Sequence, residues 1–251
     1  MDMENIDLIV GVHSIVEAIK NKQRKIVRLI ATQEGWSDLK NIYQSIEARA
    51  EIVSLHDLQE MGKKIFLDLG IEYRRISSGV LLLATRLEEL NVTNIYKDLD
   101  CGKRLKIFCL DQVTDVHNAA AILRTAAFFG VNYVLTAQKG SFGSTPSFAK
   151  IASGALEHVS IIKCSSLSKT ITKLQEKGIE TIGFTEHSEI TDVEINNSAS
   201  ICLVVGAEDV GLSNAVSRVL SKKIFLKSHG PIKSLNVSVA SAIAMERFFN
   251  F

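Results

Sequence analysis

The chain has 251 residues, of which 46% are hydrophobic and 23% are charged, and its formal net charge is +1. This length suffices for one large domain or two small ones with sizeable cores, and the composition excludes collagen, coiled coil and wholesale disorder. Residues 1–100 carry a small acidic excess and residues 101–251 a small basic excess. This difference in net charge between the two parts is compatible with an anionic partner and equally with chance variation in composition.

Apolar periodicity predicts a compact α/β unit over residues 1–88. Strands are predicted at 25–32, 51–55 and 79–85, and helices near 15–19 and at 36–49 and 56–61. The periodicity fails in the polar segment 89–104, which is therefore interpreted as the junction between two domains.

A second, longer α/β unit is predicted over residues 105–251. Its strands are expected at 105–110, 131–136, around Ile161, and at 181–185, 201–206 and 224–226, and its helices at 117–129, 167–177, 214–220 and 237–249. Continuous apolar strands between amphipathic helices predict a mostly parallel sheet covered on both faces. Ligands of such sheets bind beyond the C-terminal ends of the strands, so the loops after Leu110, Thr185, Gly206 and Leu226 are the candidate site.

The four cysteines show no C-x-x-C spacing, so neither disulfides nor a zinc or other metal site is expected. The N-terminus is acidic where a secretion signal is basic, and the longest apolar runs are far too short to span a bilayer. A cytoplasmic protein without a membrane partner is therefore expected.

The segment Asp111–Ala126 begins at a strand end and continues into a helix. Asn118 lies at the start of that helix and Arg124 follows six residues later, on a different face. Arg124 needs a partner because its helix is otherwise apolar. A structural salt bridge and a phosphate contact by its planar fork of donors both explain it.

The segment Val204–Ser213 connects an apolar strand to a helix. It carries Gly206 and Gly211 but lacks both the Gly-Lys-Ser/Thr of a Walker loop and the G-x-G-x-x-G of a dinucleotide fold. A plain strand–turn–helix joint explains the glycines. It does not explain Glu208 at the C-terminal end of the strand.

Ser234 and Asn236 precede the last apolar helix. Capping of that helix explains either residue alone.

Three blocks in this order resemble the three motifs of the SpoU family of RNA ribose methyltransferases. They are Asn118…Arg124-Thr125-Ala126, Gly206-Ala-Glu208…Gly211-Leu-Ser213 and Ser234-Leu-Asn-Val-Ser-Val-Ala240, and the last is the most specific. Gly154-Ala-Leu-Glu-His158 is similar to the intermediate segment of that family. The resemblance covers roughly residues 105–251. Residues 1–88 more loosely resemble the L30e-like substrate-binding domain that many members carry, and 89–104 is the linker.

The resemblance implies a C-terminal chain threaded through a deep trefoil knot and a homodimer that uses S-adenosylmethionine. The implied reaction is methylation of a ribose 2′-hydroxyl in RNA, ribosomal RNA of the large subunit more than transfer RNA, and no DNA partner is expected. Carried over by motif, the catalytic positions are Arg124, Asn118, Glu208, Ser234 and Asn236, and the cofactor contacts are Gly206, Leu226 and Leu235.

Four positions depart from the family pattern. Val116 stands where Pro is usual and Ala120 where Gly is usual, while Lys227 and Ser228 replace Pro-Met. These changes are expected to affect cofactor affinity and RNA target more than the fold.

Two other functions are weighed against the methyltransferase. A non-catalytic RNA-binding or ribosome-assembly protein on the same scaffold is separated from it by cofactor binding. A dinucleotide-dependent oxidoreductase is disfavoured because the glycine fingerprint and its acidic partner are missing.

Overall fold

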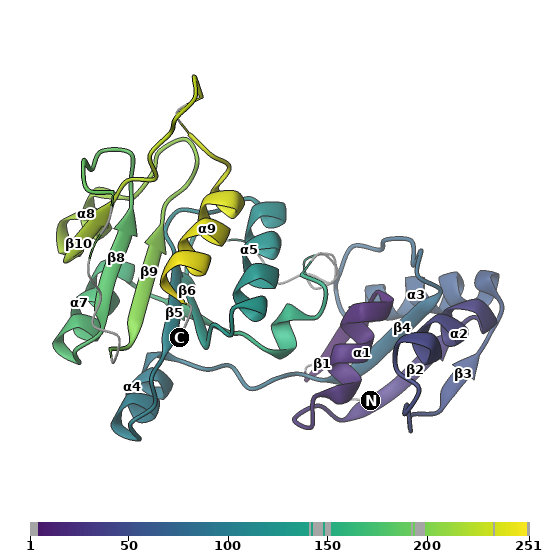
Figure 1. Ribbon diagram of the computed structural model, residues 1–251. Coiled ribbons are helices and arrows are strands. Elements are labelled where there is room, and N and C mark those ends of the chain that lie inside the picture. The colour runs from purple at the N-terminus through teal and green to yellow at the C-terminus, as the bar shows by residue number, and fades with distance from the viewer. Residues whose placement is uncertain are drawn as a thin grey trace. The chain divides into compact units, whose positions relative to one another are not determined.

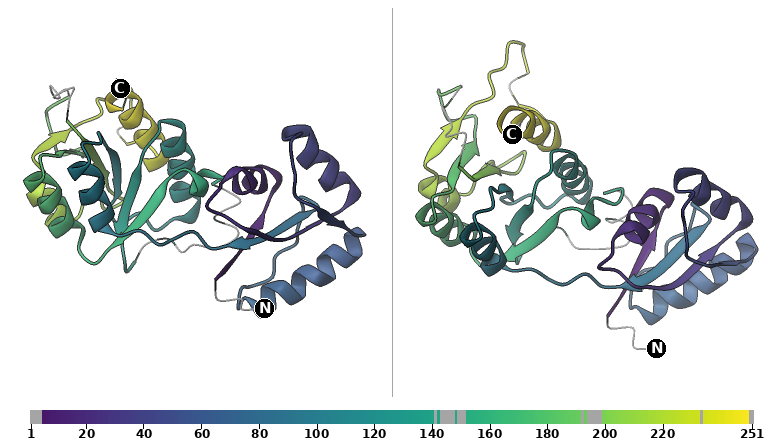
Figure 2. Two further views of the ribbon diagram at one scale, coloured as in Figure 1. Left: turned by 90° about the horizontal axis from the view of Figure 1, so that it is seen from below. Right: turned by 60° about the horizontal axis from the view of Figure 1, so that its bottom comes forward.

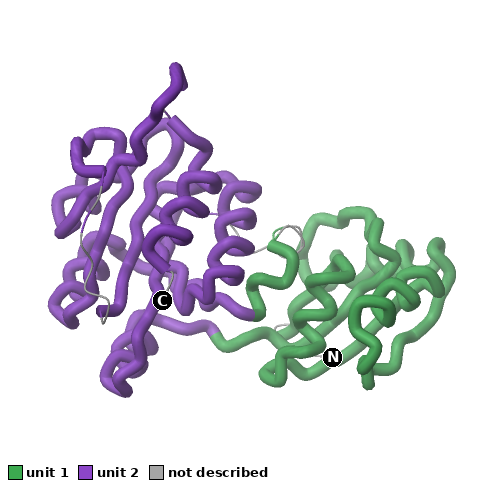
Figure 3. The backbone as a smooth tube through the Cα atoms, viewed as in Figure 1, with its two compact units in different colours: residues 1–88, 144–157 green, residues 89–143, 158–251 purple. Residues whose placement is uncertain are grey.

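The chain forms two compact units in the computed structural model (Figures 1 and 3). The structure describes residues 5–140, 142, 148, 152–191, 193, 199–232 and 234–249. The first unit comprises Met1–Glu88 and Ser144–Glu157, and the second comprises Glu89–Gly143 and His158–Phe251. The chain therefore passes between the units three times along its sequence.

The first unit contains a four-stranded sheet. Its described strands are β1 (Ile6–Val10), β2 (Ile26–Ala31), β3 (Ala50–Ile52) and β4 (Val80–Thr85), and its helices are α1 (Val12–Lys20), α2 (Gln33–Ile42), α3 (Leu55–Asp68) and the 3-10 helix η1 (Ala155–Glu157). The strand order is β1-β4-β2-β3. β4 is antiparallel to β1 and β2, whereas β3 is parallel to β2.

The central strand β4 is apolar because both faces of this sheet are covered. Leu81 and Leu83 pack in a core with α3, whereas Val80, Leu82 and Ala84 pack in a second core with α1 and α2. This alternation is the two-residue period of a strand. The first unit therefore has its own core on each side of the sheet.

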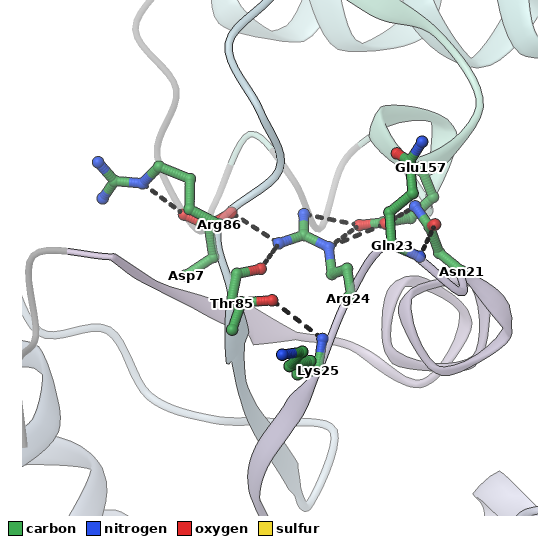
Figure 4. A network of polar contacts seen from close by, with 8 residues as sticks. All are labelled: Asp7, Asn21, Gln23, Arg24, Lys25, Thr85, Arg86 and Glu157. Atoms are coloured by element: carbon green, nitrogen blue, oxygen red, sulfur yellow. Dashed lines mark hydrogen bonds and ion pairs between the residues drawn. The ribbon is translucent and has the colours of Figure 1, made fainter.

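A buried arginine binds Glu157 to the N-terminal part of the first unit (Figure 4). The side chains of Arg24 and Glu157 are only 5% and 4% exposed. Arg24 Nε donates to both carboxylate oxygens of Glu157, at 3.0 and 2.9 Å, and Arg24 Nη1 donates to Asp7 at 2.8 Å. Asn21 Nδ2 donates to Glu157 at 2.8 Å. Charged hydrogen bonds of this kind offset the cost of burying both groups.

The second unit contains a six-stranded sheet. Its described strands are β5 (Lys106–Leu110), β6 (Tyr133–Ala137), β7 (Ser160–Cys164), β8 (Glu180–Phe184), β9 (Ile201–Val205) and β10 (Lys222–Ile224), and its helices are α4 (Val92–Asp100), α5 (Val116–Phe128), α7 (Leu167–Glu176), α8 (Asn214–Val219) and α9 (Val237–Phe248). The order is β10-β8-β9-β5-β6-β7, and every neighbouring pair is parallel. The predicted mostly parallel sheet is confirmed.

Helices cover both faces of this sheet, as parallel strands require. α4, α7 and α8 contribute apolar side chains to the core on one face. α5 and α9 lie side by side on the other face, and α9 also packs against β9 (Figures 1 and 2). Because the strands are parallel, the segments that follow β5, β9 and β10 meet at one edge.

The structure differs from the sequence predictions in several elements. The predicted linker 89–104 contains α4, whose Ile95 is fully buried in the core of the second unit. The strand predicted at 224–226 occupies Lys222–Ile224, and β1 had no predicted counterpart. Ser144–Glu157 lies inside the predicted domain 105–251 but belongs to the first unit.

In the described part of the chain, no helix has the length and apolar character needed to cross a membrane.

Candidate active site

The C-terminal edge of the parallel sheet gathers the three sequence blocks. The first follows β5 and enters α5, the second follows β9, and the third connects β10 to α9. β5 and β9 are paired neighbours, so the first two blocks leave the sheet side by side. This is the edge at which ligands of open parallel sheets bind.

The loop Gly206–Ser213 folds back on itself directly after β9. The N–H of Ala207 donates to the carbonyl of Gly211 at 3.2 Å, and the N–H of Gly211 donates to the carbonyl of Ala207 at 3.0 Å. A Cβ on Gly206 would lie 2.1 Å from the Gly211 carbonyl carbon, so only glycine fits there. Gly211 adopts a φ of +65°, which glycine takes at no steric cost. The glycines therefore shape a tight loop that carries Glu208 and Asp209 at its tip.

Polar side chains cap both helices that begin at this edge. Asp115 accepts a hydrogen bond from the N–H of Asn118 at 2.7 Å at the start of α5. Asn236 Oδ1 accepts one from the N–H of Ser238 at 2.9 Å at the start of α9. Each cap satisfies a backbone donor that the helix itself leaves without a partner.

Glu208 joins the three blocks. Its Oε1 accepts hydrogen bonds from the N–H of Val237 at 2.9 Å, from Asn118 Nδ2 at 3.3 Å and from Asn236 Nδ2. Asn236 Nδ2 also donates to Asn118 Oδ1 at 3.0 Å. A carboxylate is stabilised at the N-terminus of a helix, where backbone N–H groups and the helix dipole favour negative charge. The acid that a plain loop did not explain is thus the link between β9, α5 and α9.

Arg124 and Ser234, the other two predicted catalytic residues, lie outside this cluster. Arg124 is exposed on α5, and Ser234 is exposed before α9. Neither side chain forms a hydrogen bond or ion pair with another residue of the described chain. Glu208 accepts hydrogen bonds from amide groups, and no residue that the structure describes forms a salt bridge with Arg124.

The predicted cofactor contacts lie at the same edge. Gly206 directly follows β9, Leu226 lies two residues beyond β10, and Leu235, which is half-exposed, precedes α9. Within the described residues, the backbone N–H and C=O groups of Leu226 and Leu235 have no hydrogen-bond partner. Backbone donors and acceptors beside accessible leucine side chains suit a ligand with both polar and apolar parts, such as S-adenosylmethionine.

Three of the four departures from the family pattern have a clear place in the structure. Val116 occupies the first position of α5, where Pro is common, and the Asp115 cap before it is intact. Ser228 Oγ donates to the carbonyl of Ile232 at 2.6 Å and closes the turn between β10 and α9. Ala120 is fully buried in α5.

Sequence reasoning missed Asp111, which is buried directly after β5 and accepts the N–H of Ser213 at 2.6 Å. The signal was available, because an acidic residue at the C-terminal end of a buried strand is costly to bury without a donor. No group of three His, Cys, Asp or Glu side chains in the described ranges is arranged to hold a metal ion.

Residues 106–246 match a family model described as SpoU rRNA Methylase family. The chain is also 30% identical over 250 residues to the 23S rRNA (guanosine-2'-O-)-methyltransferase RlmB of Coxiella burnetii, covering 97% of this chain and 95% of that protein. The protein belongs to the SpoU rRNA methylase family. It is thus a methyltransferase that acts on RNA and uses S-adenosylmethionine.

Solved structures share the fold of this SpoU methylase. A putative RNA methyltransferase of the TrmH family from Porphyromonas gingivalis aligns with a TM-score of 0.70 at 21% identity, covering 98% of this chain and 90% of that chain. The SpoU methyltransferase AviRb from Streptomyces viridochromogenes, in complex with AdoMet, aligns with a TM-score of 0.70 at 16% identity and covers 96% of this chain and 88% of that chain. Both alignments extend over both units.

Proposed function

We propose that this SpoU methylase methylates the 2′-hydroxyl of a ribose in large-subunit ribosomal RNA, with transfer RNA as the less favoured target. The observation that carries the proposal is the hydrogen-bonded cluster of Asn118, Glu208 and Asn236, which joins the three motif blocks at one edge of the sheet. Similarity to RlmB along nearly the whole chain supports ribosomal RNA, and its name suggests a guanosine.

The cluster is assigned to positioning. A bound S-adenosylmethionine supplies an electrophilic methyl group, and the chain must place a ribose hydroxyl in line with it. Glu208 fixes the starts of α5 and α9, and with them the amide side chains of Asn118 and Asn236. Ser234 and the proposed cofactor contacts Gly206, Leu226 and Leu235 belong to the segments that follow β9 and β10 at the same edge of the sheet. Such fixed geometry supplies much of the rate of a two-substrate reaction.

Arg124 is assigned to the RNA. A guanidinium is a poor general base but a good phosphate ligand, because it stays protonated and presents a planar fork of N–H donors. Its exposure on α5 suits a role in holding the phosphate and orienting the hydroxyl whose proton must leave. The lack of a partner within the described chain supports this assignment.

We infer that the protein is a homodimer, with α5 and α9 at the interface. These adjacent helices leave Phe128, Val239 and Ile243 exposed, and Phe128 is 84% exposed. Exposed apolar side chains on packed helices are typical of interaction surfaces. Light scattering should give about twice the 27.6 kDa chain mass. A monomer at micromolar concentration would contradict a site shared between two chains.

Three further features are proposed from the family resemblance. They are an L30e-like, RNA-binding role for the first unit, a trefoil knot in the C-terminal chain, and a cytoplasmic location. The independent core of the first unit supports its assignment as a separate domain. The return of the chain from β10, at the edge of the sheet, to α9 beside α5 supports the knot.

Cofactor binding tests the proposal against a non-catalytic RNA-binding function. Isothermal titration of the full chain with S-adenosylmethionine should show saturable binding, and Arg124→Ala should leave that affinity nearly unchanged. Tight binding of ribosomal RNA without any cofactor binding would instead establish the non-catalytic function and implicate Val116, Ala120, Lys227 and Ser228.

A further inference from the structure

Asp111 is a buried acid at the edge of the site that none of the three motif blocks assigns a role. It follows β5 directly and is only 4% exposed. Its Oδ2 accepts a hydrogen bond from the N–H of Ser213 at 2.6 Å, and its own N–H donates to the carbonyl of Val205 at 2.9 Å. A carboxylate buried to this extent is stable only when donors compensate for its lost hydration.

The next residue makes a second contact to the same loop. Gln112 adopts a φ of +62°, which is uncommon for a residue with a side chain. Its Nε2 donates to the carbonyl of Gly211 at 3.4 Å. The turn after β5 thus contacts the returning leg of Gly206–Ser213 at two successive points.

That returning leg ends in the N-terminal cap of α8. Ser213 Oγ accepts the N–H of Val216 at 3.3 Å, while the N–H of Ser213 is the group held by Asp111. The loop is closed between Ala207 and Gly211, so a shift of its returning leg also moves its tip. The tip carries Glu208, which accepts the hydrogen bonds from α5 and α9.

We propose that Asp111 is a positioning residue of the methyltransferase site, which holds the loop Gly206–Ser213 through the N–H of Ser213 and thereby places Glu208. The expected effect on cofactor binding rests on the proposed function, because Gly206 is a proposed cofactor contact. Asp111 acts through the backbone of the loop.

Two substitutions separate the hydrogen bond from the charge. Asp111→Ala removes the acceptor, whereas Asp111→Asn keeps an amide oxygen that accepts the N–H of Ser213 without the negative charge. Asp111→Ser, whose hydroxyl is too short to reach, serves as a second acceptor-deleting variant if the alanine variant does not fold. Circular dichroism of each full chain reports whether it is folded.

The first readout is hydrogen–deuterium exchange of the peptide that spans 206–213, measured without cofactor. The second is the Kd for S-adenosylhomocysteine by titration. Asp111→Ala should speed exchange of this peptide and raise the Kd about tenfold, the loss expected when a hydrogen bond to a charged group is removed. Asp111→Asn should restore both to within about threefold of the unsubstituted chain.

Asp98→Ala is the matched control. Asp98 accepts the hydroxyl of Tyr133 at 2.7 Å, and Tyr133 is the first residue of β6, at the opposite end of the strands from Asp111. This variant should lower the stability of the second unit but leave exchange of the 206–213 peptide and the Kd unchanged.

Unchanged exchange in folded Asp111→Ala or Asp111→Ser would overturn the proposal, and so would an asparagine variant as impaired as alanine. If the unsubstituted chain does not bind S-adenosylhomocysteine, the proposed function fails, but the exchange measurement still decides the role of Asp111. Faster exchange of the 206–213 peptide in both Asp111→Ala and Asp98→Ala would show that Asp111 only stabilises the second unit as a whole. That result would also overturn the proposal.

Discussion

Removal of Arg24 should selectively destabilise the first unit. In Arg24→Ala, the carboxylate of Glu157, 4% exposed in the intact protein, keeps only the hydrogen bond from Asn21 among the contacts drawn in Figure 4. Breaking a buried ion pair by deleting one partner costs about 3–5 kcal/mol, because the other charge stays buried. For a unit of this size, each kcal/mol corresponds to about 4–8 °C in Tm. The expected loss is therefore at least about 12 °C.

An exposed ion pair in the first unit, formed by Arg28 of β2, supplies the control. Arg28 donates to Glu51 at 2.7 Å, but these side chains are 42% and 45% exposed. Solvent screens such pairs, so Arg28→Ala should cost less than about 1 kcal/mol. Both variants remove an arginine from the first unit, but the Arg24–Glu157 pair is buried and the Arg28–Glu51 pair is exposed.

The single tryptophan makes this measurement specific to one unit. Trp36 lies in α2, so its fluorescence during thermal unfolding reports the first unit. The double variant Arg24→Ala/Glu157→Ala should lose less stability than the two single variants together, because it leaves no stranded charge. Equal Tm shifts for Arg24→Ala and Arg28→Ala would refute the reasoning from burial.

Two further predictions concern titratable groups in the second unit. Burial raises the pKa of the thiols of three cysteines, so iodoacetamide at pH 8 should label exposed Cys101 and should label Cys109, Cys164 and Cys202 only after unfolding. Rapid labelling of a buried thiol in the folded chain, detected by mass spectrometry, would contradict this. Hydrogen bonds from Lys103 and Tyr133 lower the pKa of Asp98. The stabilisation by Asp98 is therefore complete above about pH 4 and is lost as the pH falls through the lowered pKa. Urea unfolding between pH 5 and 2 should show a weaker acid dependence for Asp98→Asn, and identical profiles would contradict it.

Periodicity predicted the second sheet well because its strands are buried on both faces. The run Ile201–Val205 is continuously apolar and fully buried, which is the strongest sequence signal a strand has. By contrast, α4 is amphipathic but short, and Ile95 is its one buried residue. A helix with one buried position has too weak an apolar periodicity to be distinguished from a polar linker by sequence.

The place of Ser144–Glu157 in the first unit was not predictable from local sequence. It depends on Arg24 and Glu157, which are 133 residues apart, and pairing over that distance leaves no periodic signal. In the site, the motif blocks predicted Asn118, Glu208 and Asn236, which the fold brings together. They did not predict which groups donate hydrogen bonds to Glu208, because that depends on how α5 and α9 pack.

Transfer of labelled methyl groups tests the central claim most directly. Purified protein and labelled S-adenosylmethionine are incubated with total RNA from cells that lack the protein, and the RNA is digested to nucleosides. We expect label on a ribose 2′-oxygen of large-subunit ribosomal RNA, and loss of that label with Arg124→Ala. Label on a base, or equal transfer by Arg124→Ala, would contradict the assigned chemistry. Absence of label, with cofactor binding absent as well, would contradict the enzyme itself.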